Sequence, residues 1–209
     1  MLDNITVIEH SAIRIDGEKV IYFDPFKVRG EPHDADIIFI THDHYDHFSP
    51  EDIAKVSNDG TVFAAPASTA KSFGKEGISE SRVTFMEPGG TASVLGYPVE
   101  AVAAYNIMKP FHPKGKGWLG YVVTIGSTRI YVCGDTANTP EAQAVKCDIV
   151  CVPIGGFYTM NAKSASELVK AMKPRIAIPI HYGSIIGKPS DAQEFEKYVG
   201  SAAKVVIKL

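Results

Sequence analysis

Three of the seven histidines in this sequence lie within six residues, at His42, His44 and His47, and Asp43 and Asp46 stand between them. Imidazole and carboxylate groups are the ligands that suit borderline divalent metal ions. His42 and His44 are two residues apart, so their side chains can point the same way from an extended segment. Asp46 and His47 would then reach past the first ion toward a second, as in two-metal centres with ions about 3.5–4 Å apart. A solvated polar loop is the alternative, but it would not require three histidines.

The elements on either side of this cluster predict where it sits in the fold. Residues 36–40 form a continuous apolar run, which is typical of a strand buried on both faces. The segment Ser49-Pro50-Glu51 then supplies a capping side chain, a proline for the first turn and an acid at the positive end of a helix dipole. The cluster is therefore expected at the C-terminal end of a buried strand, just before a helix.

The N-terminal residues predict short strands joined by a tight turn. Asp16-Gly17 offers the positive φ angles that a two-residue hairpin requires. The strands predicted here are residues 5–8, 12–15 and 20–23.

The second half of the chain repeats this order of hairpin, helix start and buried strand. Gly126-Ser127 predicts a hairpin, and Thr139-Pro140-Glu141 repeats the helix-start chemistry. A capping box from Ser164 to Glu167 predicts another helix, which stops before Pro174. The remaining elements are strands at 119–125, 128–133, 148–152, 175–180 and 204–207, and a helix at 190–199 that Gly200 closes. Two such halves predict an α/β fold of two sheets packed face to face with helices outside, a four-layer αββα sandwich in one domain, 1–209.

Composition limits the classes of protein that need to be considered. With 209 residues, 45% of them hydrophobic, the chain can bury a core without disulfide bonds. The three cysteines have no framework spacing, no basic segment leads into an apolar one, and no apolar run approaches about 18 residues, so we expect a cytoplasmic protein without membrane association. The net charge of −3 does not attract polyanions, which disfavours nucleic acid as a partner.

Residues 42–47 read H-x-H-x-D-H, which resembles the signature of the metallo-β-lactamase superfamily. Asp24-Pro25, Gly134-Asp135-Thr136 and His181 follow in the order and spacing of that superfamily, so the resemblance covers nearly the whole chain. It implies that Asp135 bridges two metal ions and that His181 joins Asp46 and His47 at the second ion. The mixture of imidazole and carboxylate ligands favours Zn²⁺ and admits Mn²⁺.

Each of these assignments has an ordinary structural alternative. Asp135 could cap a turn, and His181 could be a core histidine at a strand end. The signature at residues 42–47 disfavours these alternatives, because without Asp135 and His181 the metal ions would lack part of their ligands. Asp24 is expected to accept the ring N–H of a ligand histidine and so fix its tautomer, with a simple Asp-Pro turn as the alternative.

The chain departs from the superfamily pattern at one ligand. The third histidine of the first metal site, which usually lies between the signature and the bridging aspartate, has no matching motif here. His112 and Asn106 are the available substitutes, and His112 is favoured because imidazole binds transition metals better than an amide; Asn106 would then hydrogen-bond substrate or water. An amide ligand or a depleted first site stays open. His10 is expected to border the cleft, and His33 to lie in an ordinary loop.

Further segments resemble the branch of the superfamily that contains the ascorbate-6-phosphate lactonase-like proteins, which are metal-dependent hydrolases. These are His10-Ser11, residues 153–156 and residues 180–183. In such enzymes a water between two divalent ions loses a proton near neutral pH, and the hydroxide attacks a carbonyl carbon or a phosphorus. Asp46 and Asp135 would orient that water, and His181 or Tyr182 would assist the departing oxygen.

The predicted substrate is a small anionic ester, lactone or phosphodiester. Lys109, Lys114 and Lys116 lie on or beside the loop 110–118 and would hold its negative charge, unless they are simply solvated. A non-catalytic metal-binding or ligand-sensing protein is one alternative. A nuclease-type phosphodiesterase is another, although Phe111 and Trp118 alone make a poor stacking platform. The sequence leaves a homo-oligomer open.

Overall fold

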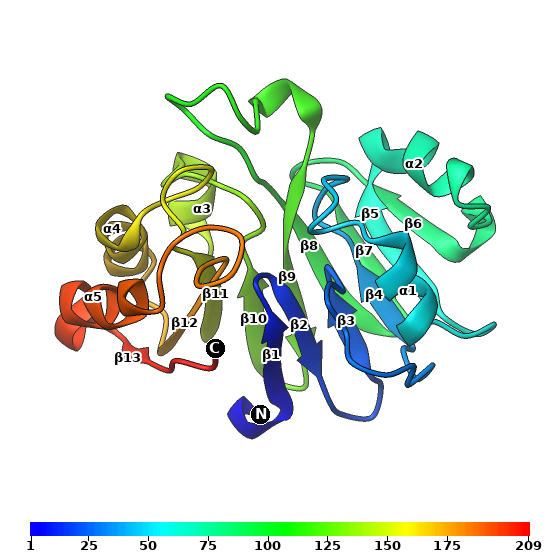
Figure 1. The fold of residues 1–209 in the computed structure, drawn as a ribbon, viewed down its shortest axis with the longest axis horizontal. Helices are drawn as coiled ribbons and strands as arrows, with labels where there is room; N and C mark the ends of the chain where they lie inside the picture. Colours follow the sequence, from blue (N-terminus) through cyan, green and yellow to red (C-terminus); the bar gives the residue numbers. More distant parts are fainter.

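Two mixed β-sheets lie face to face at the centre of the molecule, and helices cover the outer side of each (Figure 1). The computed structural model describes residues 1–209 without a gap. The first sheet has 6 strands in sequence order, and the second has 7 in the order β13-β12-β11-β10-β9-β8-β7. This arrangement confirms the predicted four-layer αββα sandwich.

The first sheet is built by the N-terminal part of the chain, with two helices on its outer face. Its strands are β1 (Ile5–Glu9), β2 (Ala12–Ile15), β3 (Ile21–Phe23), β4 (Ile37–Phe39), β5 (Val62–Pro66) and β6 (Val83–Met86), and its helices are α1 (Pro50–Val56) and α2 (Ala70–Lys75).

The second sheet is built by the remainder of the chain, with three helices outside it. Its strands are β7 (Thr91–Val94), β8 (Tyr97–Ala103), β9 (Leu119–Ile125), β10 (Thr128–Val132), β11 (Ile149–Pro153), β12 (Ile176–Ile180) and β13 (Lys204–Val205), and its helices are α3 (Pro140–Ala144), α4 (Ala162–Met172) and α5 (Ser190–Val199). None of the helices in the molecule has the length and hydrophobicity needed to span a bilayer.

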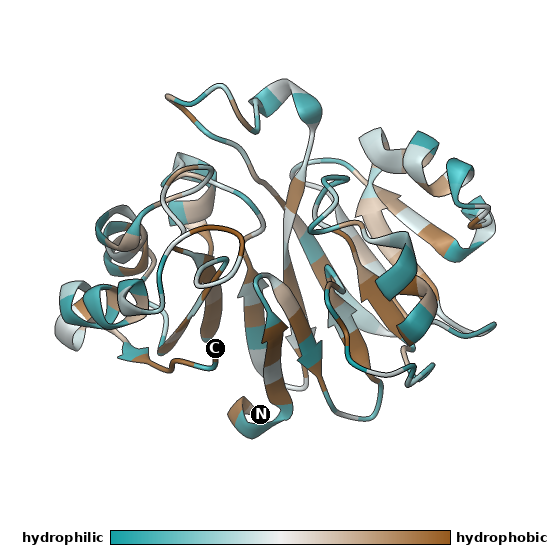
Figure 2. Cartoon of the chain, viewed as in Figure 1, coloured by the Kyte–Doolittle hydropathy of each residue, from teal (hydrophilic) through white to brown (hydrophobic).

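Three apolar layers hold the sandwich together. The largest, a cluster of 22 buried residues, lies between the sheets, where Phe39 stacks on Phe23 and packs against Tyr121 with ring centroids 4.7 and 5.1 Å away. Clusters of 19 and 11 buried residues pack the helices against the second and the first sheet. Figure 2 shows hydrophobic residues concentrated on the strands and hydrophilic ones on the helices and loops. Central strands such as β4 are thus buried on both faces, as the apolar run 36–40 predicted.

The helix-start signals are confirmed where they flank the histidine cluster and its counterpart. Ser49 caps α1 by accepting a hydrogen bond from the Asp52 N–H at 3.3 Å. Thr139 caps α3 by accepting from the Ala142 N–H at 3.2 Å. α5 occupies the predicted 190–199 and ends at Gly200.

Two local predictions are wrong. β2 and β3 pair antiparallel as expected, but residues 16–20 form the loop between them, and neither Asp16 nor Gly17 has a positive φ. The N–H of Val20 instead donates to the Asp36 carboxylate at 2.8 Å. This bond holds Val20 beside the start of β4. α4 begins at Ala162 rather than at Ser164, because the Asn161 side chain accepts the Ser164 N–H at 2.9 Å and takes the capping role.

Candidate metal centre

The cluster forms because several strands end at the same edge of the sandwich. β1, β3 and β4 run in one direction in the first sheet, and β8, β10 and β12 do so in the second. The carboxyl ends of such strands commonly carry the functional residues of α/β folds. The residues that follow these ends are His10 after β1, Asp24 after β3, the segment 41–47 after β4, the loop 104–118 after β8, Asp135 after β10 and His181 after β12.

Strained backbone accompanies several of these strand ends. Eight residues other than glycine have a positive φ, and four of them are His10 at 54°, Asp24 at 44°, His112 at 56° and His181 at 59°. Such a conformation is uncommon for residues with a Cβ and costs on the order of 1–3 kcal/mol, so it persists only where the surroundings impose it. Half of the strained positions thus belong to one polar cluster, which is typical of a functional site.

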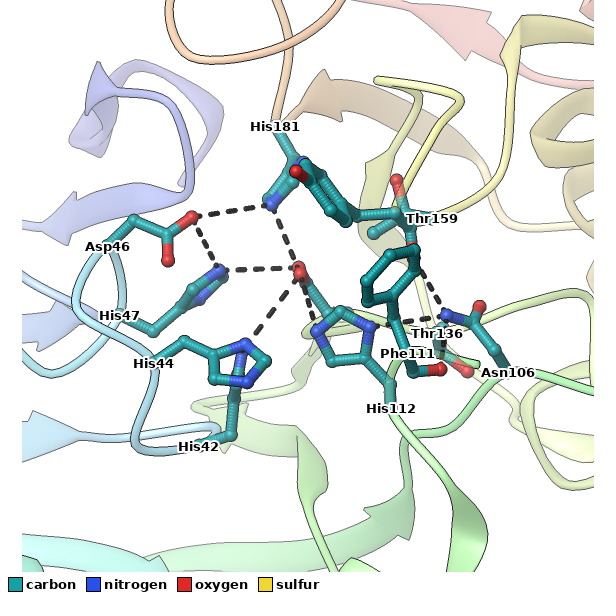
Figure 3. A network of polar contacts seen from close by, with 12 residues as sticks. His42, His44, Asp46, His47, Asn106, Phe111, His112, Thr136, Thr159 and His181 are labelled. Atoms are coloured by element: carbon teal, nitrogen blue, oxygen red, sulfur yellow. Dashed lines mark hydrogen bonds and ion pairs between the residues drawn. The ribbon is translucent and has the colours of Figure 1, made fainter. Parts of the chain in front are cut away.

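Three histidines form the first group of ligand atoms. His42, His44 and His112 place one ring nitrogen each within 4.8 Å of one another, and they point toward a common centre in Figure 3. The Nε2 of His42 lies 3.1 Å from the Nδ1 of His44. Trp118 packs against all three rings, with centroids 4.7 to 5.4 Å away, and walls this side of the site.

The second group contains the three residues that the sequence assigned to the second metal. Asp46, His47 and His181 come together, and the Asp46 Oδ2 lies 3.6 Å from the His47 Nε2 and 3.8 Å from the His181 Nε2. His10 joins this group instead of only bordering the cleft: its Nε2 is 3.3 Å from the same oxygen of Asp46. The His10 ring also packs on His181 at a centroid distance of 3.8 Å.

Asp135 lies between the two groups. Its Oδ2 is 3.2 Å from the His112 Nε2 of the first group and 3.1 Å from the His181 Nε2 of the second. Its Oδ1 lies 3.4 Å from the His47 Nε2. The carboxylate thus contacts imidazoles of both groups, which is the position that a bridging ligand requires.

Unpartnered polar atoms show that these residues fit metal ions. Seven buried atoms in the cluster have no hydrogen-bond partner, namely both ring nitrogens of His10 and of His181, the Nε2 atoms of His47 and His112, and the Oδ1 of Asp135. A buried polar atom left in this state costs about 1–3 kcal/mol, so several of them in one place need an explanation. Imidazole nitrogens and carboxylate oxygens that converge are the donor set of a divalent cation.

The electrostatics favour the metal-binding protonation states of Asp135, Asp46 and His42, whereas at His47 burial opposes protonation but the carboxylates of Asp135 and Asp24 raise the pKa well above its usual value. Burial opposes ionisation of Asp135, but neighbouring imidazoles, His181 foremost, hold its pKa well below the usual value. Burial also opposes ionisation of Asp46, yet the contact with His10 helps to lower the pKa of Asp46 to about 2. Burial itself lowers the pKa of His42. Ionised carboxylates and neutral imidazoles are the forms that bind metals.

Asp24 orients one of the histidines, as the sequence predicted for it. Its carboxylate is fully buried, and the Oδ2 lies 2.7 Å from the Nδ1 of His47. The N–H and the hydroxyl of Thr41 donate to the two oxygens at 2.7 and 2.6 Å. With Nδ1 engaged in this way, the Nε2 of His47 faces Asp135.

Replacing Asp24 with asparagine is expected to weaken metal binding about tenfold to a hundredfold, because partners of this kind hold a ligand histidine in place and raise its basicity. Asp43→Asn is a matched control, since Asp43 lies in the same loop but is exposed and bonds to Ser72 instead of the cluster. Competition of each variant against a chelating dye measures the affinity. Equal affinities in the two variants would show that Asp24 does not support the site.

His112 and Asn106 occupy different positions relative to the cluster. His112 faces Asp135 directly, as described above, whereas the Asn106 amide nitrogen donates to the backbone carbonyls of Phe111 at 2.9 Å and Tyr158 at 2.7 Å. The Asn106 N–H also donates to the carbonyl of His112 at 2.8 Å. The Asn106 amide nitrogen also lies 3.2 Å from the Nδ1 of His112, so Asn106 braces both the ring of His112 and the loop that carries it.

His112→Ala is expected to lower metal occupancy more than Asn106→Ala does, because only the first variant removes a ring nitrogen from the cluster. Metal analysis after dialysis against a limiting concentration of Zn²⁺ compares the two. The reverse order, with Asn106→Ala depleted and His112→Ala fully loaded, would assign the missing ligand to an amide.

Some of the predicted residues do not reach the cluster. Tyr182 follows the left-handed residue His181 after the end of β12, is buried in the cluster that packs the helices against the second sheet, and lines a separate pocket. Lys114 pairs with Glu141 at 2.6 Å. Lys109 donates to the backbone carbonyls of residues 156, 157 and 159. The structure thus does not place these two lysines where they could hold a substrate, contrary to the prediction.

A pocket of about 280 Å³ opens onto the cluster. Five of its lining residues are cluster members, and the other four are large and mostly apolar. The lining consists of His44, Asp46, His112, Asp135 and His181, together with Tyr45, Phe111, Tyr158 and Ile185. None of these four residues was predicted to line the site, although Tyr45 stands inside the signature and Tyr158 follows a buried strand.

Comparison with known proteins gives a consistent set of similarities. The model of the beta-lactamase superfamily domain matches residues 4–181. The chain is 33% identical to a UPF0173 metal-dependent hydrolase of Thermoplasma acidophilum, over 99% of this chain and 96% of the relative. It is 30% identical to another from Pyrococcus abyssi, over 97% and 95%.

Solved structures show the same similarity. A candidate metal-dependent hydrolase from Parabacteroides distasonis is 29% identical and superposes with a TM-score of 0.82, with 98% of this chain and 92% of that one covered. A metallo hydrolase from the archaeon Ignicoccus hospitalis, at 24% identity, shares the fold with a TM-score of 0.79 over 97% and 93%.

Proposed function

The chain belongs to the metallo-β-lactamase superfamily and to its UPF0173 metal-dependent hydrolases, and from this premise we propose that it hydrolyses a small ester, lactone or phosphodiester with two divalent metal ions. The observation that carries the proposal is the Asp135 carboxylate, which lies within 3.1 to 3.4 Å of imidazoles from both histidine groups. Zn²⁺ is the ion we expect, with Mn²⁺ also accepted, because the donors combine imidazole and carboxylate.

The two groups divide the ligands between the ions. One ion would be held by His42, His44 and His112, and the other by Asp46, His47 and His181. Asp135 would be a ligand of both ions. Bound there, divalent ions lower the pKa of water and polarise the oxygen of an electrophile.

The side chains that line the pocket supply positioning and proton transfer. Asp46 and Asp135 are ionised, so each can accept a hydrogen bond from the attacking water and direct its oxygen at the substrate. His181 lines the pocket and Tyr182 does not, so His181 is the one of this pair that reaches the site, where its Nε2 would hold a metal ion.

The pocket favours a small substrate with an apolar part. Its volume of about 280 Å³ lies just below the range of roughly 300–1,000 Å³ that is common for ligand sites. No lysine or arginine is among its lining residues, so a negative charge on the substrate would have to be met by the metal ions and histidines. The same lack of cations disfavours a nuclease, which needs them along the phosphate backbone. Placement in the branch of ascorbate-6-phosphate lactonase-like proteins stays a prediction.

A panel of p-nitrophenyl esters, lactones and bis-p-nitrophenyl phosphate, assayed with added Zn²⁺ or Mn²⁺, tests the proposal. We expect turnover of at least one class, lost on chelation and in Asp135→Asn but retained in Asp43→Asn. Stoichiometric metal binding without turnover of any compound would favour a non-catalytic metal-binding or ligand-sensing protein.

A further inference from the structure

Exposed apolar side chains gather on the loops that form the pocket. Among the large hydrophobic residues that are exposed, Tyr45 at 67%, Ile107 at 55%, Met108 at 92% and Phe157 at 61% belong to these loops. The loop between β8 and β9, green in Figure 1, projects from this end of the molecule and carries two of them. Exposed apolar groups around a concave site are typical of ligand binding.

Three aromatic rings connect this surface with the metal centre. Phe111 and Tyr158 line the pocket, with centroids 4.9 Å apart, and Phe157 packs against them at 5.6 and 4.9 Å. We refer to Phe111, Tyr158 and Phe157 as the aromatic ladder. It forms a continuous apolar path from the pocket to the solvent.

Polar contacts behind the ladder hold its two loops together. The Lys109 ammonium donates to the carbonyls of Gly156, Phe157 and Thr159. The Asn106 amide joins the carbonyls of Phe111 and Tyr158. Both side chains bond to the backbone, so they leave the aromatic faces free. A surface that is ordered before binding loses less entropy when a ligand docks.

We propose that the aromatic ladder binds an apolar arm of the substrate, an aryl group or a medium-length alkyl chain, next to the bond that is cleaved. Cleavage next to the arm rests on the proposed function, whereas binding of the arm does not depend on it. The absence of lysine and arginine from the pocket lining and the continuity of the ladder with the pocket both favour an uncharged arm. A methylene group that becomes buried strengthens binding roughly fourfold, so the length of the arm should be readily detected.

Hydroxamic acids with arms of increasing length test this inference, because the hydroxamate binds a metal centre whether or not the protein turns over any ester. Calorimetric titration of the metal-loaded protein with acetohydroxamic, benzohydroxamic and octanohydroxamic acid gives the affinities. We expect octanohydroxamic acid to bind at least tenfold more tightly than acetohydroxamic acid. Phe157→Ala should reduce this ratio at least threefold, whereas Tyr198→Ala, an exposed aromatic on α5, should preserve it.

The proposal is overturned if affinity does not rise with the length of the arm, or if the rise is the same in Phe157→Ala as in Tyr198→Ala. Light scattering at two protein concentrations identifies a competing occupant, since a dimer that dissociates in Phe157→Ala would assign the ladder to a second copy of the chain. If the protein hydrolyses esters at a rate that is independent of arm length, the aromatic ladder does not bind the arm, but the proposed hydrolase function holds. If hydroxamate affinity depends on arm length but no ester is hydrolysed, the ladder binds the arm and the proposed hydrolase function is wrong.

Discussion

Asp135→Asn is expected to reduce turnover on the order of a thousandfold or more. The side chain is buried and touches imidazoles of both groups, and asparagine keeps its volume while removing the charge. Metal ions in such centres contribute several kcal/mol to transition-state stabilisation, and each loss of about 1.4 kcal/mol slows a reaction tenfold. Metal occupancy should fall as well, because the amide is a weaker donor than the carboxylate.

Turnover is measured with the best substrate of the ester panel, and metal content is measured on the same samples. Asp43→Asn provides the control for loss of a negative charge in the cluster segment, because this exposed residue points to Ser72. If Asp135→Asn kept both its ions and its activity, Asp135 would not be the bridge and the proposed mechanism would fail.

Removal of the metal ions is expected to lower the melting temperature by roughly 5–10 °C. An ion present at about a hundred times its dissociation constant stabilises the folded state by about 2.7 kcal/mol, and 1 kcal/mol corresponds to about 2–4 °C for a domain of this size. The unpartnered nitrogens of His47, His112 and His181 identify where the stabilisation arises, since a cation would satisfy them together.

Differential scanning calorimetry of chelated and reconstituted protein measures this shift. Zn²⁺ or Mn²⁺ should restore stability, whereas Ca²⁺ should not, because it prefers oxygen ligands. The response should be smaller in Asp135→Asn. Identical melting curves for the chelated and the reconstituted protein would contradict a metal site in this cluster.

The elements next to the cluster could be predicted because their signals are local. Ser49 and Thr139 cap helices with side chains that act within three residues, and the apolar run before His42 is buried in any arrangement of layers. β5 to β8 were not predicted. Pro98 and two alanines weaken the pattern of β8, whose position depends on its pairing with β9.

The sequence pattern identified most of the cluster but did not reveal how closely its parts approach. His10 meets Asp46 because β1 and β4 end at the same edge, and a single sequence does not show that edge. His181 has a positive φ and its ring lies in the cluster while Tyr182 packs into the core, and the weak preference of histidine for this conformation does not identify such a position in a sequence. Lys109 looked available for a substrate, but it bonds to carbonyls of a loop far away in the sequence.

Anomalous diffraction from crystals of the zinc-reconstituted protein locates the metal ions directly. We expect two peaks per chain, roughly 3.5–4 Å apart. One should lie among His42, His44 and His112, the other among Asp46, His47 and His181, with Asp135 in contact with both. A single peak, or peaks outside these two groups, would contradict the two-metal centre.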